Sequence, residues 1–169
     1  MTASYINTKD NTIADKASRL KVDSNDFEID NIAFRRITSA LGEPEIDLFA
    51  SYNTQKCERY YSWFPDPNSS GVDAFVQDWS NHFFYAFPPF ALINRVLCKI
   101  LSEGSTGILI VPKWKSQSWY PTFLKLTRSE VVSLEKGTFQ LINPSDNRPH
   151  PLCGSLNLMA AIVSGAKMK

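Results

Sequence analysis

Apolar residues recur at helical spacing in two long stretches of the chain. Residues 26–44 offer Asp26 as a possible helix cap, continue with an apolar stripe and reach Gly42, a residue that commonly ends helices. Residues 91–104 carry one broad apolar face and also close on a glycine. A further helix is expected within residues 116–126. The pattern therefore predicts two amphipathic helices and a third, shorter one.

Shorter apolar runs predict the strands. Residues 45–50 and 83–87 are runs of this kind, and the second is closed by Pro88 and Pro89. Residues 106–114 form the most strand-like run, because they are continuous and rich in branched side chains, as expected for a parallel strand covered on both faces.

Two other regions are expected to be loop and hairpin. Residues 51–71 are polar and rich in turn-forming residues, which predicts a long loop that is either functional or a plain insertion. Residues 131–142 are expected to form a hairpin that turns at Lys136 and Gly137, followed by a short apolar segment.

Helices and strands that alternate in this way predict an α/β fold with a small, open, mostly parallel sheet and flanking helices, of the Rossmann-like type. We expect a loose polar segment at residues 1–25, an α/β domain at residues 26–128, and the hairpin with a short C-terminal segment at residues 129–169, leading toward a following domain. Such sheets bind ligands beyond the carboxyl ends of their strands.

Composition narrows the classes of function. The 169 residues carry 18 basic and 17 acidic side chains, so no overall field draws the chain to nucleic acid or anionic lipid. Three widely spaced cysteines argue against a disulfide framework or a zinc ribbon and favour a reducing compartment. No apolar run approaches the roughly 20 residues of a membrane span. We expect an intracellular protein, cytoplasmic or nuclear, without membrane contact.

The corner after the second strand, Phe87, Pro88, Pro89 and Phe90, resembles the base-binding signature of methyltransferases that act on amino groups in DNA. That signature is a polar residue, two prolines and an aromatic residue. The target base flips out and stacks on the aromatic ring, while the polar side chain and a backbone carbonyl hold the amine. A strand end that merely stops the sheet and packs Phe90 into the core is the alternative interpretation.

The flanking sequence resembles the phage-type DNA adenine methyltransferase family over roughly residues 45–125. The resemblance implies S-adenosylmethionine as the cofactor, with Asp47, Ala50, Asp73 and Asp78 on the cofactor side of the site. The residues that carry it are Asp47, Ala50, Ser51, Asn53, Lys56, Cys57, Arg59, Tyr60, Gln77, Asp78, Trp79, Val111, Pro112 and Trp119.

The chain departs from that family just before the prolines. The family carries Asn or Asp there, whereas Phe87 offers no hydrogen-bond acceptor to the target amine. The loss of such a preorganised contact typically costs about 10² to 10³ in rate. The turn after the first strand also lacks a clearly glycine-rich loop for the cofactor.

Residues 11–19 resemble the closing motif of the RNase H domain in retroelement polyproteins, where Asp15 matches the last carboxylate of a two-metal site. The other carboxylates would lie upstream of Met1, so Asp15 would be a remnant of an incomplete metal site. This motif, the methyltransferase-like region and residues 147–165 follow the order seen in retroelements of the DIRS type, which integrate through a tyrosine recombinase.

Several single residues keep two interpretations. Asp47 would contact the cofactor or cap a turn, and Asp73 and Asp78 would meet the adenosyl group or be solvated at the surface. His82 and His150 stand alone in the sequence and are expected to be ordinary histidines rather than bases or metal ligands.

A further segment is a candidate for nucleic-acid contact. Lys113, Trp114 and Lys115 would form a rim that stacks on bases and binds phosphates, as in proteins that bind single strands. The alternative interpretation is that Trp114 and Trp119 are buried in an amphipathic helix.

The sequence therefore predicts a non-catalytic, methyltransferase-like module of a retroelement polyprotein that links reverse transcriptase and RNase H to a recombinase. An active S-adenosylmethionine-dependent DNA adenine methyltransferase and a decayed fragment without a role are the alternatives. The expected cofactor is none or S-adenosylmethionine, and the expected partners are DNA or RNA and the flanking polyprotein domains.

Overall fold

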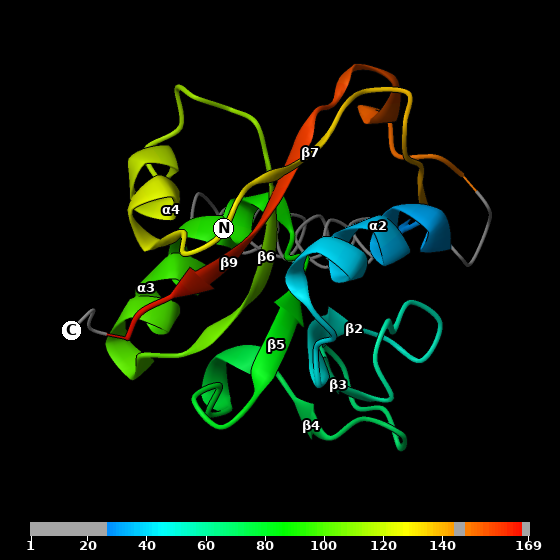
Figure 1. The fold of residues 1–169 in the computed structure, drawn as a ribbon. Coiled ribbons are helices and arrows are strands. Elements are labelled where there is room, and N and C mark those ends of the chain that lie inside the picture. Colours follow the sequence, from blue (N-terminus) through cyan, green and yellow to red (C-terminus); the bar gives the residue numbers. More distant parts are fainter. Residues whose placement is uncertain (1–26, 144–147, 167–169) are drawn as a thin grey trace, which may run out of the picture.

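The computed structural model describes residues 27–143 and 148–166. A seven-stranded sheet runs through the centre, and helices cover both of its faces (Figure 1). The first five strands in spatial order are parallel, and the sixth is antiparallel to both of its neighbours. In spatial order the strands are β4 (Gly71–Val72), β3 (Arg59–Ser62), β2 (Ile46–Ala50), β5 (Phe83–Ala86), β6 (Thr106–Pro112), β9 (Leu158–Ser164) and β7 (Val132–Leu134).

The helices and a small second sheet complete three layers. Helices α3 (Ile93–Glu103) and α4 (Tyr120–Leu126) lie on one face of the central sheet, and α2 (Asn31–Leu41) lies on the other (Figure 1). The second sheet pairs β1 (Glu28–Ile29) with β8 (Leu141–Ile142) and packs into the core on the α2 side. The predicted α/β fold, with a mostly parallel sheet and flanking helices, is confirmed.

The strand order reverses beside β2. From β2 the chain moves outward to β3 and β4, then returns to the other side of β2 as β5 and continues to β6. Open α/β sheets leave a crevice at such a reversal, outside the carboxyl ends of the two strands involved. The carboxyl ends of β2 and β5 therefore mark the place where a ligand site is expected.

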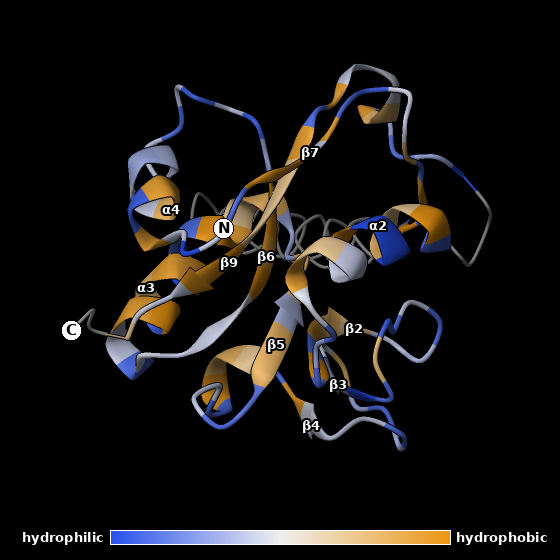
Figure 2. Cartoon of the chain, viewed as in Figure 1, coloured by the Kyte–Doolittle hydropathy of each residue, from blue (hydrophilic) through white to orange (hydrophobic). Residues whose placement is uncertain are grey.

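Each face of the sheet has its own core. Along β6, Leu109 and Val111 pack toward α3 and α4, whereas Ile108 and Ile110 pack toward α2. Side chains alternate between faces because successive residues of a strand point in opposite directions. All four are fully buried, so β6 is covered on both faces as predicted, and Figure 2 shows its apolar colouring between the two helical layers.

The close approach of β5 and β6 depends on Gly107. A Cβ atom at this position would overlap the ring and the backbone oxygen of Phe84, which is fully buried and cannot move aside. Only glycine fits there without displacing the strand that carries the candidate site.

Helix α2 begins later than its sequence pattern predicts. Asp30, not Asp26, caps the helix, and its Oδ1 accepts a 2.9 Å hydrogen bond from the Ala33 backbone N–H. The preceding residues instead pair as β1 with β8. The helix ends as predicted at Gly42, whose φ of 112° suits glycine.

Two loop predictions are corrected. Residues 51–71 contain the short strand β3 and the first residue of β4, which pairs parallel to it, rather than one long loop. The predicted hairpin at residues 131–142 is wrong, because β7 pairs with β9 and β8 pairs with β1. A turn does occur at Gly137, where φ is 82°. Because β9 pairs with both β6 and β7, strands β7 and β9 belong to the central sheet.

Some sequence predictions fall beyond the described residues. The segment 1–25, with the RNase H-like motif and Asp15, lies outside them, as does Asp26. Within residues 27–143 and 148–166, no helix is both long and apolar enough to span a bilayer.

Candidate functional site at the carboxyl edge of the sheet

The Pro-Pro turn lies at the carboxyl end of β5, beside the strand reversal. We call Phe87, Pro88, Pro89 and Phe90 the base-side corner. The Leu92 N–H donates to the Pro89 carbonyl at 2.9 Å, which starts a 3-10 turn, η2 (Phe90–Leu92), that leads into α3. No described backbone N–H outside regular elements donates to the carbonyl of Phe87 or Pro88. Two acceptors at this corner therefore stay available.

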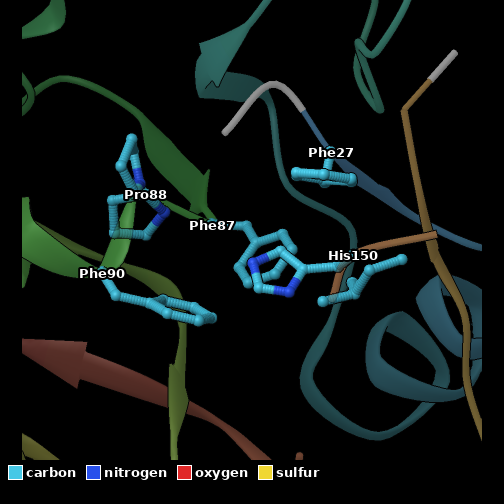
Figure 3. A pocket seen from close by; sticks show the side chains of 7 residues that line it. Phe27, Phe87, Pro88, Phe90 and His150 are labelled. Carbon is cyan, nitrogen blue, oxygen red and sulfur yellow. The ribbon is translucent and has the colours of Figure 1, made fainter. Parts of the chain in front are cut away.

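A small hollow opens at the base-side corner. Its enclosed volume is about 20 Å³, room for about one water molecule, so a base would lie across its mouth rather than inside it. Figure 3 shows aromatic side chains from the corner and from the start of the described chain that turn toward one imidazole ring. We call this space the corner hollow, and it is lined by Phe27, Phe87, Pro88, Pro89, Phe90, Leu141 and His150.

The aromatic rings around the corner hollow are packed against one another. The Phe27 and His150 ring centroids are 4.7 Å apart, those of Phe90 and His150 are 6.0 Å apart, and those of Phe87 and Phe90 are 6.3 Å apart. Two rings that sandwich a base need about 7 Å between their planes, twice the contact distance of carbon atoms. A planar ligand would therefore lie against one ring face rather than between two.

His150 is the polar side chain of this wall. Its Nδ1 accepts a 3.0 Å hydrogen bond from the Leu152 N–H, and its backbone N–H donates to the Leu141 carbonyl at 2.9 Å. Partial burial lowers the pKa of His150 below its usual value, which favours the neutral ring. No sequence motif indicates this placement, which arises because β8 brings residue 150 beside the base-side corner.

The predicted nucleic-acid segment adjoins the same corner. Trp114 follows the carboxyl end of β6, and its ring meets Phe90 edge to face at a centroid distance of 5.1 Å. Lys113 and Lys115 on either side are exposed. Trp119, by contrast, is buried in the core on the α3 side, as the alternative interpretation expected. The structure thus brings two separately predicted sites together through one ring contact.

The other side of the strand reversal is closed by its own hydrogen bonds. Asp47 in β2 is buried, with 2% of its surface exposed. Its Oδ2 accepts from the Lys56 N–H at 3.0 Å, and its Oδ1 accepts from the Phe49 N–H at 3.3 Å. The Ser51 N–H, just beyond β2, donates to Thr54 Oγ1 at 2.8 Å. We call residues 51–58 the β2 turn; Asp47 ties it down as a capping residue does.

Asp66 holds the loop between β3 and β4 through hydrogen bonds of the same kind. Its carboxylate accepts from the Tyr60 hydroxyl at 2.7 Å, from the Asn68 N–H at 2.9 Å and from the Tyr52 N–H at 3.1 Å. The hydrogen bond from Tyr60, followed by the one from Asn68, lowers the pKa of Asp66. This carboxylate, which the sequence reasoning did not single out, is used within the protein.

The remaining cofactor-side candidates are spread over both edges of the sheet. Ala50 ends β2 beside the strand reversal, and Asp73 follows β4 at the same carboxyl edge. Asp73 has a φ of 63° and accepts from the Phe75 N–H at 3.0 Å, which caps the 3-10 turn η1 (Ala74–Val76). Asp78 lies at the opposite edge, because the neighbouring Trp79 N–H donates to Glu103 at the end of α3.

The residues on the cofactor side do not fit S-adenosylmethionine as the sequence resemblance implies. Asp47 is buried and engaged, and Asp78 lies at the other edge of the sheet. The β2 turn contains no glycine to form a cradle. These three features argue against a cofactor at the predicted residues.

Other reactive side chains near the sheet lack the features of a catalytic group. Burial, followed by the charge of Asp47, raises the pKa of Cys57 to about 12, so its thiol is a poor nucleophile. His82 lies 3.5 Å from Glu45 at the amino edge, an ordinary surface pairing. In the part of the chain that the structure describes, no cluster of three or more His, Cys, Asp or Glu residues is placed to hold a metal ion.

Comparisons with known proteins add no family. The sequence matches no protein-family model, and no curated protein matches it. We therefore infer function from the geometry of the carboxyl edge, and the resemblance to phage-type methyltransferases stays a prediction.

Proposed function

We propose that the chain is a non-catalytic, methyltransferase-like module that binds an unpaired nucleobase at the base-side corner. One observation carries the proposal: the two strand ends at the reversal are unequal. The corner after β5 keeps an aromatic hollow and two available carbonyls, whereas the turn after β2 is closed by internal hydrogen bonds.

The base-side corner has the properties that a flipped base requires. Phe90 offers an aromatic ring, and its edge-to-face contact with Trp114 fixes the orientation of that ring. The carbonyls of Phe87 and Pro88 are acceptors for an exocyclic amine. Lys113 and Lys115 flank the corner, where the phosphates of a bound strand would pass.

Phe87 is the reason for proposing binding without methyl transfer. Its ring turns into the corner hollow (Figure 3), so the position that would hold the target amine presents only carbon atoms. The engaged Asp47 on the cofactor side argues in the same direction. Within a retroelement polyprotein of the kind that the sequence resembles, such a module would hold a strand between the RNase H and recombinase domains.

The binding claim can be tested with a nucleic acid that carries one base. Two labelled single-stranded DNA oligonucleotides of equal length are compared by fluorescence anisotropy, one with a central base flanked by abasic sites and one abasic throughout. We expect the single base to tighten binding about tenfold, because stacking on an aromatic side chain contributes ~1–3 kcal/mol. Equal affinities would contradict base binding.

Two matched variants localise the effect. Phe90→Leu keeps an apolar side chain but removes the ring, and should abolish the advantage of the single base. Phe64→Leu is the control, because Phe64 is an exposed aromatic residue outside the corner hollow. A loss of the advantage in Phe64→Leu, with none in Phe90→Leu, would place base binding elsewhere and contradict the proposal.

An active DNA adenine methyltransferase is the second candidate function. The available carbonyls of Phe87 and Pro88 favour it, since they would hold the target amine without a polar side chain. Incubation of the protein with DNA of mixed sequence and S-adenosylmethionine labelled in its methyl group separates the two functions. Label in the DNA would establish the enzyme and overturn the non-catalytic proposal, whereas unlabelled DNA with retained base binding supports that proposal.

A further inference from the structure

Charged side chains are divided between the two halves of the central sheet. Residues 43–90, which form β2, β3, β4 and β5, carry seven acidic and two basic side chains. Residues 91–130, which form α3, β6 and α4, carry six basic and two acidic ones. Because β6 lies next to β5, the acidic and basic halves meet beside the base-side corner. An anionic ligand at the corner is therefore attracted toward α4 and repelled from β2.

The acidic side chains of the first half are largely used within the protein. The carboxylates of Asp47, Asp66, Asp73 and Asp78 each accept a hydrogen bond from a backbone N–H, and so does that of Glu45. Such bonds hold turns and cap short helices. The negative charge of this half thus has a structural role, and it does not require the basic half of a second copy as its partner.

The exposed lysines of the second half have no such role. Within residues 27–143 and 148–166, the lysines that form ion pairs are Lys56 and Lys99. Lys113, Lys115 and Lys125 are exposed, and no described carboxylate pairs with them. We call these three residues the basic row. Their charge is available to an anionic partner.

The basic row begins at an open recess beside the base-side corner. The recess has a volume of about 660 Å³ and is lined by Lys113, Trp114, Lys115, Ser116 and Gln117. Ser116 and Gln117 add neutral donors to the two ammonium groups, and phosphate oxygens accept hydrogen bonds from all of these side chains. The lining of the recess therefore suits a sugar-phosphate backbone.

From the recess, the basic row runs along α4 to the other edge of the sheet. The Lys113 N–H donates to the Asn157 carbonyl just before β9, and the Arg128 N–H, beyond α4, donates to the Ile162 carbonyl within β9. The five residues between these two carbonyls span roughly 17 Å at about 3.4 Å per residue. Lys125 lies in the last turn of α4, at the far end of this span. At a rise of about 3.4 Å per nucleotide, a stacked single strand covers it with about five nucleotides.

We propose that a single-stranded nucleic acid bound at the base-side corner continues along the basic row, where Lys125 binds its phosphates. This inference rests on the proposed base-binding function and adds the path of the nucleic acid across the protein. Unlike Phe90, the row contacts no base, so it contributes to the affinity for every sequence alike.

The test uses fully abasic single-stranded DNA, which presents phosphates without bases. A strand of about ten nucleotides is within the usual size of such sites. Its Kd is measured by fluorescence anisotropy at several salt concentrations. Each phosphate contact contributes about 0.7 to the slope of log Kd against log salt concentration, so three lysines predict a slope of about 2. Lys125→Gln should lower the slope by about 0.7, and an unchanged slope would overturn the inference.

Arg35→Gln is the matched control. Arg35 is exposed on α2, which covers the opposite face of the sheet, so its removal should leave the slope unchanged (Figure 1). An equal loss in both variants would make the effect one of overall charge and would overturn the inference.

Two further outcomes are distinguishable from these. Self-association at low salt that Lys125→Gln abolishes, measured by sedimentation velocity without nucleic acid, would assign the basic row to a second copy and overturn the inference. Because the abasic strand has no bases, the salt slope is independent of base binding. The proposed function fails instead if a central base adds no affinity to this strand, whatever the slope.

Discussion

The polar groups at the carboxyl ends of β2 and β5, the two strands at the reversal, differ in their hydrogen bonding. After β2, the Asp47 carboxylate accepts from the Phe49 and Lys56 N–H groups, and the Ser51 N–H has Thr54 as its acceptor. After β5, the carbonyls of Phe87 and Pro88 receive no hydrogen bond from a described backbone N–H outside regular elements. Buried polar groups in proteins are nearly always paired, so the paired groups after β2 indicate a structural role, whereas the carbonyls after β5 are where the proposed base would bond.

The proposed function gives the two strand ends different roles. A Rossmann-like sheet offers the same edge to both strand ends, and a methyltransferase would need both, one for the cofactor and one for the base. Of these two described strand ends, the one after β5 adjoins a hollow, and the one after β2 is closed by its own hydrogen bonds. The predictions below test this inequality, beginning with the largest expected effect.

Removal of the Asp47 carboxylate should destabilise the β2 turn. We expect Asp47→Ala to lower the free energy of unfolding by about 3 kcal/mol, because two backbone N–H groups lose their acceptor in a buried place. Urea denaturation measures the change. Glu58→Ala is the control, since Glu58 is an exposed carboxylate on the same β2 turn and should cost less than about 0.5 kcal/mol. A tolerated Asp47→Ala would contradict the role of Asp47 in holding the β2 turn.

Asp73, just after β4, provides a second test of the side chains that cap the loops on the predicted cofactor side. Its φ of 63° and its cap on the Phe75 N–H predict that Asp73→Ala costs about 2 kcal/mol, since alanine tolerates this backbone poorly and makes no cap. Asp73→Gly should be close to neutral, because relief of the backbone offsets the lost cap. If both substitutions cost the same, backbone conformation is not what holds Asp73.

Substitution of Trp114 tests the base-side corner. We expect Trp114→Leu to weaken the binding of single-base strands about threefold, because the edge-to-face contact that orients Phe90 is lost while Phe90 remains. The affinity for the fully abasic strand should stay unchanged, which serves as the internal control. Equal weakening of both strands would make Trp114 a general contact rather than a support for Phe90.

The smallest expected effect is a pH dependence from His150. Burial lowers the pKa of this histidine below its usual value of about 6.5, so the unfolded chain binds the proton more readily than the folded protein does. The free energy of unfolding should therefore fall as the pH drops from the unfolded pKa through the folded one. His150→Asn should show a shallower fall in the same pH window, and an identical pH profile would contradict a neutral, buried ring.

Much of the fold follows from local sequence. The strand β6 was predictable because a run of six residues without a polar side chain after Thr106 is typical of a strand covered on both faces. Helix α3 was predictable from its apolar face and from Gly104, whose φ is 68°. The residues that predict β6 and α3 lie within or directly beside these elements.

The rest depends on partners that are distant in sequence. Strand β4 has only two residues, too few for a pattern, and forms because β3 lies beside it. Strand β7 reads as half of a hairpin, but its partner β9 begins more than twenty residues later. Turn chemistry at Gly137 indicates a change of direction without saying which strand follows.

The candidate site divides in the same way. The base-side corner was predictable because its four residues are contiguous and resemble a known motif. His150 was not, since a single histidine has no pattern and reaches the corner only through the pairing of β8 with β1 and with Pro149. Asp47 kept two interpretations in the sequence, and its hydrogen bonds favour the turn cap.

In the proposed function, the β2 side is closed to a cofactor while the β5 side binds a base. The most direct measurement is a calorimetric titration of the protein with S-adenosylmethionine, beside the variant Phe87→Asn that restores an amide at the corner. Two temperatures are used, so that burial of apolar surface gives heat in at least one. The account predicts no binding heat in either protein. Saturable heat in both would show an open cofactor site and contradict the account.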